Sequence, residues 1–319
     1  MELLDKKDKR LLYALELHGR RSESELAKKI GLSREVVRYR LKKLERQGII
    51  RYHMTLVNTL NLGYLMFRTY YKFTGLSKAK EKELITFMQK HVNWVTIVEG
   101  RWNLTTMNFS KDVFEFQSFM DKLKQQFGEY IQDYWVSTMT GLYHYRRGFL
   151  IDKKDDYFIK MGSRKNRPTL DLLDKQILST LLENGRMSYV EIGKRLKQNA
   201  KLIRDRMNRL KKDDVILGFT PFLNMSKLGM LYYKVHFKLK NYSPESYRSL
   251  LRYALQHPNI VFTVEAVGGA DLELEIQVKD NNHLYSIIHD IRENFNFIHD
   301  YYFMEYTKEH TLDYLPRAF

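Results

Sequence analysis

Apolar residues recur at helical spacing in three short stretches at the start of the chain, each bounded by residues that begin and end helices. Asp and Ser side chains cap helix starts, and Gly commonly ends helices. The predicted helices follow Asp5, Ser22 and Ser33 and end near Gly19, Gly31 and Gly48. In the third helix, residues 33–47, Val37, Leu41 and Leu44 stand at i, i+4 and i+7 and form one apolar stripe. Three helices with a tight Gly-Leu-Ser turn before the third predict a helix-turn-helix unit.

The pattern then changes to alternating stretches separated by two longer amphipathic ones. Residues 49–58 alternate loosely and could form a small β-wing. Beyond them the predicted strands are 64–73, 94–99, 104–109 and 131–140, and the predicted helices are 77–91 and 113–127. The order β-α-β-β-α-β predicts a ferredoxin-like domain, in which one antiparallel sheet carries helices on one face. Its other face must be covered, because it would otherwise leave an exposed apolar patch.

The whole pattern occurs twice, at a constant offset of 166 residues. Asp5 matches Asp171, and the pair Gly19-Arg20 matches Gly185-Arg186. The charged stretch between the copies contains Gly, Ser and Pro and is typical of a linker. We therefore predict an α+β protein, a tandem duplication of a winged helix-turn-helix and a ferredoxin-like βαββαβ domain. The predicted boundaries are 1–56 and 169–220 for the two DNA-binding domains, 57–150 and 221–319 for the two ferredoxin-like domains, and 151–168 for the linker.

Charge gives the third helix of the first unit a candidate partner. The chain has a formal net charge of +16 and a pI of about 9.6, which favours polyanions. Six cations and two anions surround the apolar stripe of residues 33–50. The second helix of a helix-turn-helix pair enters the major groove of DNA, where Arg can bind guanine edges and Lys can contact phosphates. The predicted contacts to double-stranded DNA are Ser33, Arg34, Arg38, Tyr39, Lys42, Lys43 and Arg46. The alternative is a solvated basic face without a partner.

The second unit departs from this pattern at its turn. Lys197-Gln198-Asn199 replaces Gly31-Leu32-Ser33, and Asp205 stands where the first unit has Tyr39. A carboxylate near phosphates weakens binding unless it accepts from a cytosine amine. The candidate DNA contacts in this unit are Asn199, Lys201, Arg204, Asn208 and Arg209. We expect both units to bind, the first more strongly, and to read an asymmetric site. The alternative is that the second unit is mainly a scaffold.

Other chemistry has little support in the sequence. Cysteine is absent, which excludes disulfides, thiolate metal sites and thiol nucleophiles. No histidine pair has metal-ligand spacing, and we expect structural roles for His144 and His310 and helix-end capping for His91 and His257. No catalytic motif, signal peptide or 18-residue apolar run stands out. We expect a cytoplasmic protein that is not an enzyme, needs no cofactor or metal and does not bind membranes.

These features together resemble the Lrp/AsnC (feast/famine) family, and most closely its archaeal tandem members. The matching stretches are LDKKDKRLLYALELHGR, AKKIGLSREVVRYRLKKLERQGII, the two Asn-x-x-x-Leu-Gly steps, and the strand-turn-strand regions at EGRWNL and VGGADLEL. The resemblance implies a transcriptional regulator whose RAM-type ferredoxin-like domains pair and sense small molecules, often amino acids. It also implies effector contacts at the turn between the middle strands, which here are Gly100, Asn103, Gly268, Gly269 and Asp271. The alternative is that both are plain hairpin turns.

Two questions stay open at this level. The ferredoxin-like domains could pack sheet to sheet within one chain, as a pseudo-dimer, or pair with a second chain as a homo-oligomer. The function could instead be that of a nucleoid-like architectural protein that binds DNA broadly. A remote alternative is an enzyme like the siroheme decarboxylases, which share this architecture. Those enzymes need His and Arg on the middle strands, and here the strands read NWVTIVEG and NIVFTVEA, without His.

Overall fold

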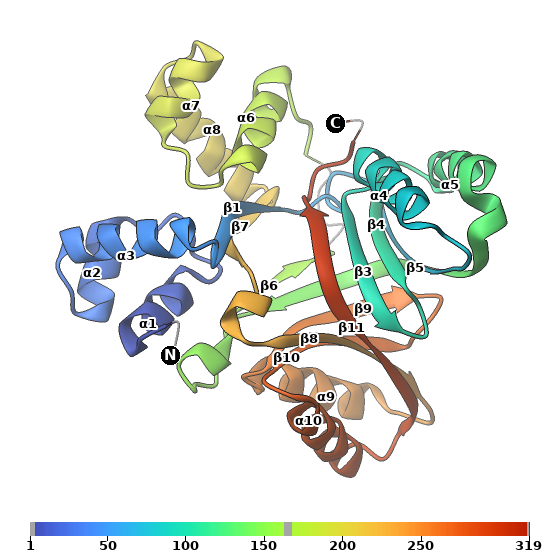
Figure 1. Ribbon diagram of the computed structural model, residues 1–319. Coiled ribbons are helices and arrows are strands. Elements are labelled where there is room, and N and C mark those ends of the chain that lie inside the picture. Colours follow the sequence, from blue (N-terminus) through green and yellow to red (C-terminus); the bar gives the residue numbers. More distant parts are fainter. Residues whose placement is uncertain (1–3, 163–167, 318) are drawn as a thin grey trace.

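The computed structural model describes residues 4–162, 168–317 and 319 and contains both copies of the predicted unit (Figure 1). Each copy begins with three helices. We call the first trio head one and the second head two. Head one is α1 (Lys6–Leu15), α2 (Glu23–Ile30) and α3 (Arg34–Arg46), and head two is α6 (Leu172–Glu183), α7 (Tyr189–Leu196) and α8 (Ala200–Lys212). The helix-turn-helix prediction is confirmed for both copies.

The second part of each copy has the predicted β-α-β-β-α-β order. In copy one it is β2 (Leu65–Phe73), α4 (Lys78–His91), β3 (Trp94–Gly100), β4 (Leu104–Ser110), α5 (Val113–Phe127) and β5 (Ile131–Tyr145). In copy two it is β8 (Leu231–Leu239), α9 (Pro244–Gln256), β9 (Ile260–Val267), β10 (Leu272–Val278), α10 (Asn281–Asn294) and β11 (Ile298–Leu312). Short 3₁₀ turns lie at Gly128–Tyr130, Gly148–Leu150 and Ser226–Leu228. The last strand of each copy is longer than predicted, because it continues along a strand of the other copy.

The two four-stranded sheets join edge to edge rather than stacking face to face. Strand β3 pairs with β11, and β5 pairs with β9, all antiparallel. Because β5 also pairs with β2, the eight strands form one closed sheet, in the order β2-β4-β3-β11-β8-β10-β9-β5. We call this closed sheet the ring. The pairing within one chain, expected as one of two possibilities, is therefore present, but through strand edges. The uncovered faces of the two sheets face each other inside the ring.

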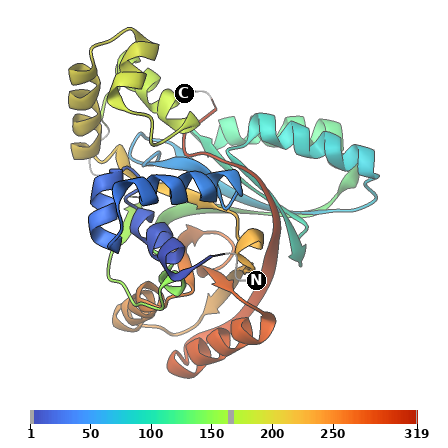
Figure 2. The same cartoon turned by 60° about the vertical axis from the view of Figure 1, so that its left-hand side comes forward.

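Alternation along each strand divides the side chains between the inside and the outside of the ring. On β2, Phe67 and Tyr71 point outward and pack under α4 and α5, whereas Arg68 and Tyr70 point inward. Helices α9 and α10 cover the outside of copy two in the same way, with Leu250 and Ile288 in their core. The helices therefore lie outside the ring in both copies (Figures 1 and 2).

The predicted β-wing is a strand, but its partner lies in the other copy. Strand β1 (Ile50–Val57) pairs antiparallel with β7 (Ile216–Leu223), and we call this two-stranded element the ribbon. The ribbon lies between the heads and the ring (Figure 1). Part of the predicted linker is also ordered as a strand, because β6 (Phe158–Met161) pairs with the end of β5. Residues 163–167 of that linker lie outside the described residues.

Candidate nucleic-acid interface

The frame of head one is set by caps that the sequence supplies at each helix end. Asp5 accepts from the backbone N–H of Asp8, and Ser22 forms a capping box with Glu25. Gly31 ends α2 in the left-handed conformation, with φ 67°, where a side chain would be strained. Ser33 then caps α3, its hydroxyl oxygen accepting from the N–H of Val36 at 3.3 Å. The predicted DNA contact Ser33 is therefore also a structural residue.

One face of α3 is committed to the head itself. Val37, Leu41 and Leu44 are buried, so the predicted apolar stripe is confirmed. Arg40 also belongs to this face, since its Nη1 donates to carboxylate oxygens of Asp5 and Asp8, both at 2.7 Å. These bonds fix the angle between α1 and α3. They also explain why Arg40 is not available for an outside partner.

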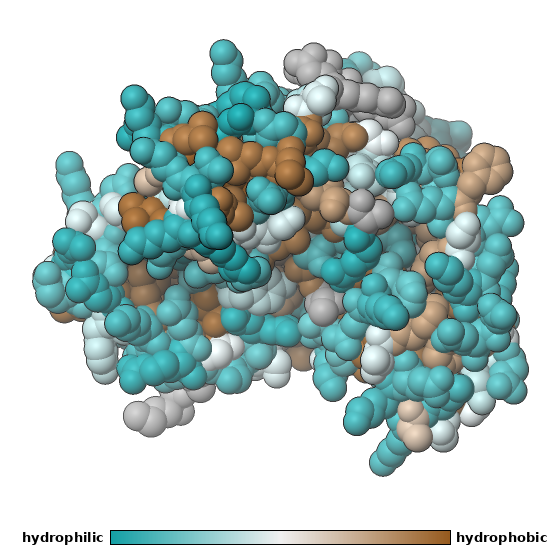
Figure 3. All heavy atoms as spheres, turned by 90° about the horizontal axis from the view of Figure 1, so that it is seen from above, coloured by the Kyte–Doolittle hydropathy of each residue, from teal (hydrophilic) through white to brown (hydrophobic). Residues whose placement is uncertain are grey.

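The opposite face of α3 is exposed and cationic. Arg34 and Arg38 lie one turn apart and both donate to Glu23, the first residue of α2, at 3.2 and 2.8 Å. Their side chains remain 56% and 46% exposed, so Glu23 orients them without burying them. Tyr39, 62% exposed, stands beside them. In Figure 3 hydrophilic side chains cover most of the end of the molecule where α2 and α3 lie.

The predicted phosphate contacts lie further along α3. Lys42 and Arg46 are exposed, and Arg46 Nε donates weakly to the carbonyl of Lys42 at 3.4 Å. Lys43 is half-buried, and its Nζ lies 3.8 Å from Asp8. A line of three cations toward the end of the helix suits contacts with a phosphate backbone, although Lys43 also balances a buried carboxylate.

Head two repeats the frame with different residues. Lys197 takes the position of Gly31 and adopts the same left-handed conformation, with φ 54°. Asn199 caps α8 by accepting from the N–H of Lys201 at 2.7 Å. Ile203, Met207 and Leu210 form the buried stripe. Head two therefore keeps the tight turn although its glycine is replaced, and Lys197 adopts a strained backbone conformation there.

The predicted contacts on the outer face of α8 are arranged differently from those on α3. Arg209 is bound to the buried Asp174, together with Arg206, so this predicted DNA contact is part of the frame. Lys201 and Asn208 are exposed. Arg204 lies 3.6 Å from its neighbour Asp205, which offsets its charge. Head two therefore lacks the neighbouring pair of arginines that head one carries, because Ala200 stands where head one has Arg34, while Lys211 and Lys212 remain exposed at the end of α8.

The two heads are joined by a reciprocal exchange of arginines. Arg20 of head one donates to the carbonyls of Gly185 and Met187, at 2.8 and 2.7 Å. Arg186 of head two donates in return to the carbonyls of Gly19 and Arg21. The glycines are needed because a Cβ at either one would lie 3.0 Å from backbone of the facing ribbon strand. With the ribbon, this exchange holds both heads on one side of the ring (Figure 2).

Sequence reasoning identified the repeated Gly-Arg pair but not its role. The matching of Gly19-Arg20 with Gly185-Arg186 was a usable signal, because a pair kept in both copies outside the apolar stripe needs another explanation. The role of Glu23 could not be inferred in this way, because its counterpart in the second copy is Tyr189 and not an acid. Tyr189 instead stacks under Arg20, with the guanidinium carbon 5.0 Å from the centre of the tyrosine ring.

The turn residues suggested as effector contacts are engaged in holding their hairpins. Asn103 accepts from the N–H of Phe73 at 2.9 Å and donates to its carbonyl at 2.7 Å. Asp271 accepts from the N–H of Leu239 at 2.9 Å. Gly100, Gly268 and Gly269 have φ between 83° and 136°, as the turns require. The effector role stays a prediction, but each of the two polar side chains has a structural role.

The ring interior contains charged residues that the sequence analysis did not single out. Lys234 is fully buried, with Nζ 2.6 Å from Glu273 and 3.2 Å from Glu275. Arg68 lies 3.7 Å from Glu275. Burial alone would raise the pKa of Glu273, but the charges of Lys234, His236 and Arg68 lower it to about 2. The spacing of Glu273 and Glu275 could have indicated these buried charges, because the two residues stand two apart on the face of β10 that has no helix over it.

His91 and His257 both lie at helix ends, as expected. His91 Nδ1 lies 2.9 Å from the carbonyl of Phe87 at the end of α4. His257 is the C-cap residue of α9, where its backbone N–H donates to the carbonyl of Tyr253 at 3.0 Å, and burial lowers the pKa of its ring to about 4. Within the described residues, no three His, Asp or Glu side chains are grouped so that they could hold a metal ion. No helix of the described chain is long and apolar enough to cross a membrane.

Comparison with known proteins agrees with this architecture. The model of winged helix-turn-helix DNA-binding domains matches residues 4–51 and 170–216, one match for each head. An HTH-type transcriptional regulator of Pyrococcus horikoshii is 33% identical over 119 residues, which are 37% of this chain and 74% of that protein. The HTH-type transcriptional regulator FL11 of Pyrococcus furiosus is 29% identical over 122 residues, 38% of this chain and 80% of FL11.

A solved structure shares the fold of the whole chain. The siroheme decarboxylase NirDL superposes with a TM-score of 0.61, covering 98% of this chain and 94% of its own, at 15% sequence identity. At that identity the similarity shows a common fold, including the closed eight-stranded ring, and no more. The sequence relatives carry the family assignment. Two segments match the winged helix-turn-helix model, and the Pyrococcus horikoshii regulator is matched over 74% of its length. The chain therefore belongs to the Lrp/AsnC family of helix-turn-helix transcriptional regulators.

Proposed function

We propose that the protein is a sequence-specific DNA-binding regulator of transcription and not an enzyme. The observation that supports this most strongly is the exposed cationic face of α3, where Glu23 orients Arg34 and Arg38 side by side. Guanidinium groups held in this way suit the bidentate hydrogen bonds that read guanine in the major groove. Lys42, Lys43 and Arg46 would contact phosphates on the same side.

The two heads read one continuous site in this proposal. The ribbon and the exchange of Arg20 and Arg186 hold the heads at a fixed separation. A symmetric dimer reads a palindrome, whereas heads with different outer faces favour an asymmetric site. Head one supplies more of the affinity, since it carries the neighbouring Arg34 and Arg38, whereas head two has Ala200 and Arg204 at these positions and Arg204 lies next to Asp205.

A selection of genomic fragments by the purified protein at two salt concentrations tests this function. Phosphate contacts weaken steeply with salt, whereas base contacts give a motif that remains at the higher concentration. We expect one asymmetric motif at both concentrations. Failure to enrich any fragment at either salt would contradict DNA binding altogether.

An architectural role is the second candidate, and the net charge of +16 is the observation that favours it. A protein of that kind would enrich fragments at low salt without a motif and lose them at high salt. The same selection therefore distinguishes the two.

Enzyme activity of the NirDL kind is the third candidate, favoured only by the shared fold. The cavity inside the ring measures about 40 Å³, while sites for larger organic ligands are typically about 300–1,000 Å³. A groove of about 550 Å³ does lie outside it, along β8 and β11. Titration with iron-uroporphyrin, followed by absorbance, checks this directly. We expect no spectral change, and a saturable one would contradict the regulatory assignment.

A further inference from the structure

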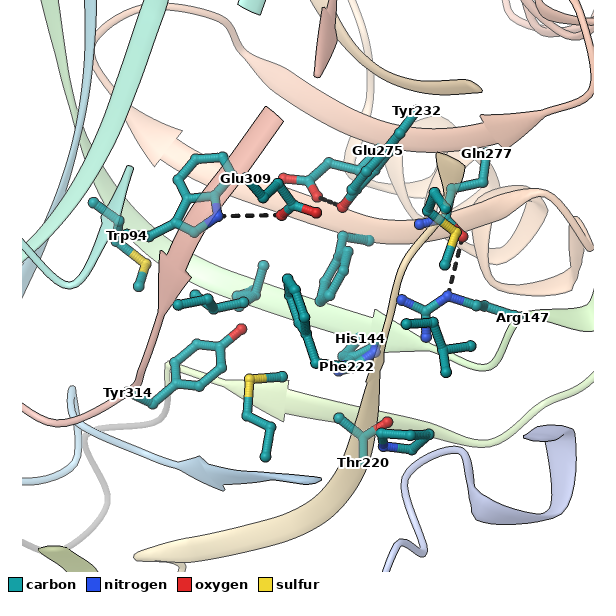
Figure 4. A pocket seen from close by; sticks show the side chains of 18 of the residues that line it. Trp94, His144, Arg147, Thr220, Phe222, Tyr232, Glu275, Gln277, Glu309 and Tyr314 are labelled. Atoms are coloured by element: carbon teal, nitrogen blue, oxygen red, sulfur yellow. Dashed lines mark hydrogen bonds between the residues drawn. The ribbon is translucent and has the colours of Figure 1, made fainter. Parts of the chain in front are cut away.

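A cavity with buried walls lies where the ribbon meets the ring (Figure 4). Its volume is about 40 Å³. Met54 of β1 and Thr220 of β7 form the wall on the ribbon side, and every one of the eight ring strands contributes at least one side chain to the rest. The cavity is therefore in contact both with the element that carries the heads and with the closed sheet.

Polar atoms in the cavity wall are buried without a hydrogen-bond partner among the described residues. They are Thr220 Oγ1, Gln277 Nε2, Arg68 Nε and both ring nitrogens of His144. All four side chains are at most 5% exposed. Buried polar groups are almost always paired, and each group left unpaired is unfavourable. Four of them around one cavity indicate a bound molecule that supplies the missing partners.

The free groups are mainly donors. The carbonyl oxygen of Gln277 already accepts from Arg147 Nε at 3.0 Å, so only its NH₂ group is free. Arg68 Nε can only donate, and Thr220 can donate through its hydroxyl. A set of this kind is complementary to ligand oxygens. In Figure 4 His144, Arg147 and Gln277 lie on one side of the cavity, with Thr220 below them and Glu309 on the far side.

Size and charge limit the ligand further. A cavity holds one water for each 10–15 Å³ or so, which leaves space for about three to four heavy atoms. Arg147 is paired with Glu16 at 2.6 Å, and Arg68 with Glu275 at 3.7 Å, so neither cation is uncompensated. Glu275 and Glu309 also line the cavity, and burial raises the pKa of Glu309 to about 7, so the ligand carries at most one negative charge, on oxygens that face the donors rather than these carboxyl groups.

We propose that this cavity binds a small carboxylate or carbonate-type anion, such as formate, acetate or bicarbonate, and that its occupancy changes the affinity for DNA. This effector role rests on the proposed regulatory function and deepens it. The site is distinct from the hairpin turns at Gly100 and Gly268. The ligand oxygens accept from Gln277, Arg68 and Thr220.

Thr220 makes the coupling to the heads direct. It follows Phe219, whose carbonyl accepts from the N–H of Gly19 at 2.6 Å. Gly19 is also the residue whose carbonyl Arg186 binds. A ligand that bonds Thr220 therefore acts on β7, the strand that positions the two heads. If it binds one arrangement of the heads more tightly than another, it shifts the equilibrium toward that arrangement.

The test uses the full chain and two matched variants. Thr220→Val removes a hydroxyl that has no partner, so it should fold at least as well as the parent. Thr105→Val removes another buried hydroxyl, on β4, that has no partner among the described residues and does not line the cavity. Formate, acetate and bicarbonate are titrated against each protein, with chloride keeping the ionic strength constant, and followed by melting temperature and calorimetry.

We expect saturable binding of at least one anion, weakened about ten- to hundred-fold by Thr220→Val and unchanged by Thr105→Val. The same anion should change the DNA affinity of the parent but not that of Thr220→Val. No saturable binding, which would mean that the cavity holds water alone, overturns the site. So does equal binding by both variants. Anion binding that leaves DNA affinity unchanged overturns the effector role. A protein that binds the anion but no DNA would instead contradict the proposed function, because the titration needs no DNA.

Discussion

The two heads have the same frame and different outer faces. In both, an N-cap aspartate and the aspartate one turn later bind an arginine of the third helix: Asp5 and Asp8 hold Arg40, and Asp171 and Asp174 hold Arg206. The exposed faces differ, because Arg34 and Arg38 share Glu23, whereas head two has Ala200 and Arg204 at these positions and Tyr189 in place of Glu23. Residues that hold the helix were kept after duplication, and several of those that would touch a partner changed.

The largest expected effect on stability comes from removing the aspartate that binds an arginine of the third helix in each head. Asp174→Ala should lower the free energy of unfolding by about 2 kcal/mol, because it removes charged hydrogen bonds to Arg206 and Arg209, which both still reach water. Asp8→Ala should cost a similar amount through Arg40. Denaturant unfolding of the two variants measures this. A clear inequality between them would show that the heads do not share one frame.

The outer faces should differ in DNA affinity. Arg38→Ala should weaken binding to the selected site by about 1–3 kcal/mol and relax the preference at one base pair. Arg204→Ala should cause a smaller loss. Titration of each variant with the same labelled duplex provides the comparison. Equal losses would mean that α8 reads bases as strongly as α3, and no loss for Arg38→Ala would remove it from the interface.

The turns offer a smaller contrast in stability. Lys197→Gly should raise the free energy of unfolding by about 1 kcal/mol, because glycine adopts a positive φ without strain. Gly31→Lys should lower it by about the same amount. Thermal and chemical unfolding of both variants can be compared with the parent. If Lys197→Gly is neutral, contacts of the lysine side chain must compensate for the strain.

The contact of Glu23 with the two arginines should restrain binding to unselected DNA. Glu23→Gln releases Arg34 and Arg38, and exposed ion pairs of this kind are worth about 0.2–1 kcal/mol, or up to about five-fold in affinity. We expect tighter binding to random-sequence DNA and a lower specificity ratio. Glu183→Gln, which breaks an exposed pair with Arg195 in head two, serves as the control. Weaker binding to random DNA would contradict the idea.

The smallest expected difference between the heads is in how acid affects stability through the two N-cap aspartates, Asp171 and Asp5. The hydrogen bond from Arg206 lowers the pKa of Asp171 to about 2, from an ordinary value near 3.8. A carboxyl with a lowered folded pKa adds stability above the unfolded pKa, and this is lost as pH falls through the folded pKa. Stability should therefore fall between about pH 4 and pH 2, and Asp171→Asn should flatten that part of the curve. For Asp5, burial opposes the bonds from Asp8 and Arg40 and the pKa is lowered, so Asp5→Asn should act in the same direction. An unchanged acid limb in Asp171→Asn would rule out this origin.

Local patterns and the repeat were sufficient to predict the heads and the order of strands and helices along the chain. The stripe of Val37, Leu41 and Leu44 depends on one helix alone, and a constant offset exposes the second copy. Edge pairing could not be predicted, since alternation shows which face of β3 is buried but not which strand lies beside it. The partner of β1 lies in another copy of the unit, so the predicted wing lacked its partner strand.

The site was predictable only in part for the same reason. Cations on α3 were visible, but the contact of Arg38 with Glu23 depends on how α2 crosses α3. Lys234 lies in the alternating stretch LYYKVHFKL and gives no sign of burial, because only ring closure removes it from water. The cavity beside Thr220 likewise exists only where ribbon and ring meet.

Closure of the ring within a single chain has a consequence for stoichiometry. A regulator assembled from two separate subunits falls apart on dilution, so occupancy of its target rises with a higher power of its concentration at low expression. Here the second half is tethered by the predicted linker, residues 151–168, and joined through the β3–β11 and β5–β9 strand pairs, so the two halves stay together on dilution. On the proposed function, with one chain as the DNA-binding unit, occupancy of the target should rise in proportion to the number of molecules, even at low expression.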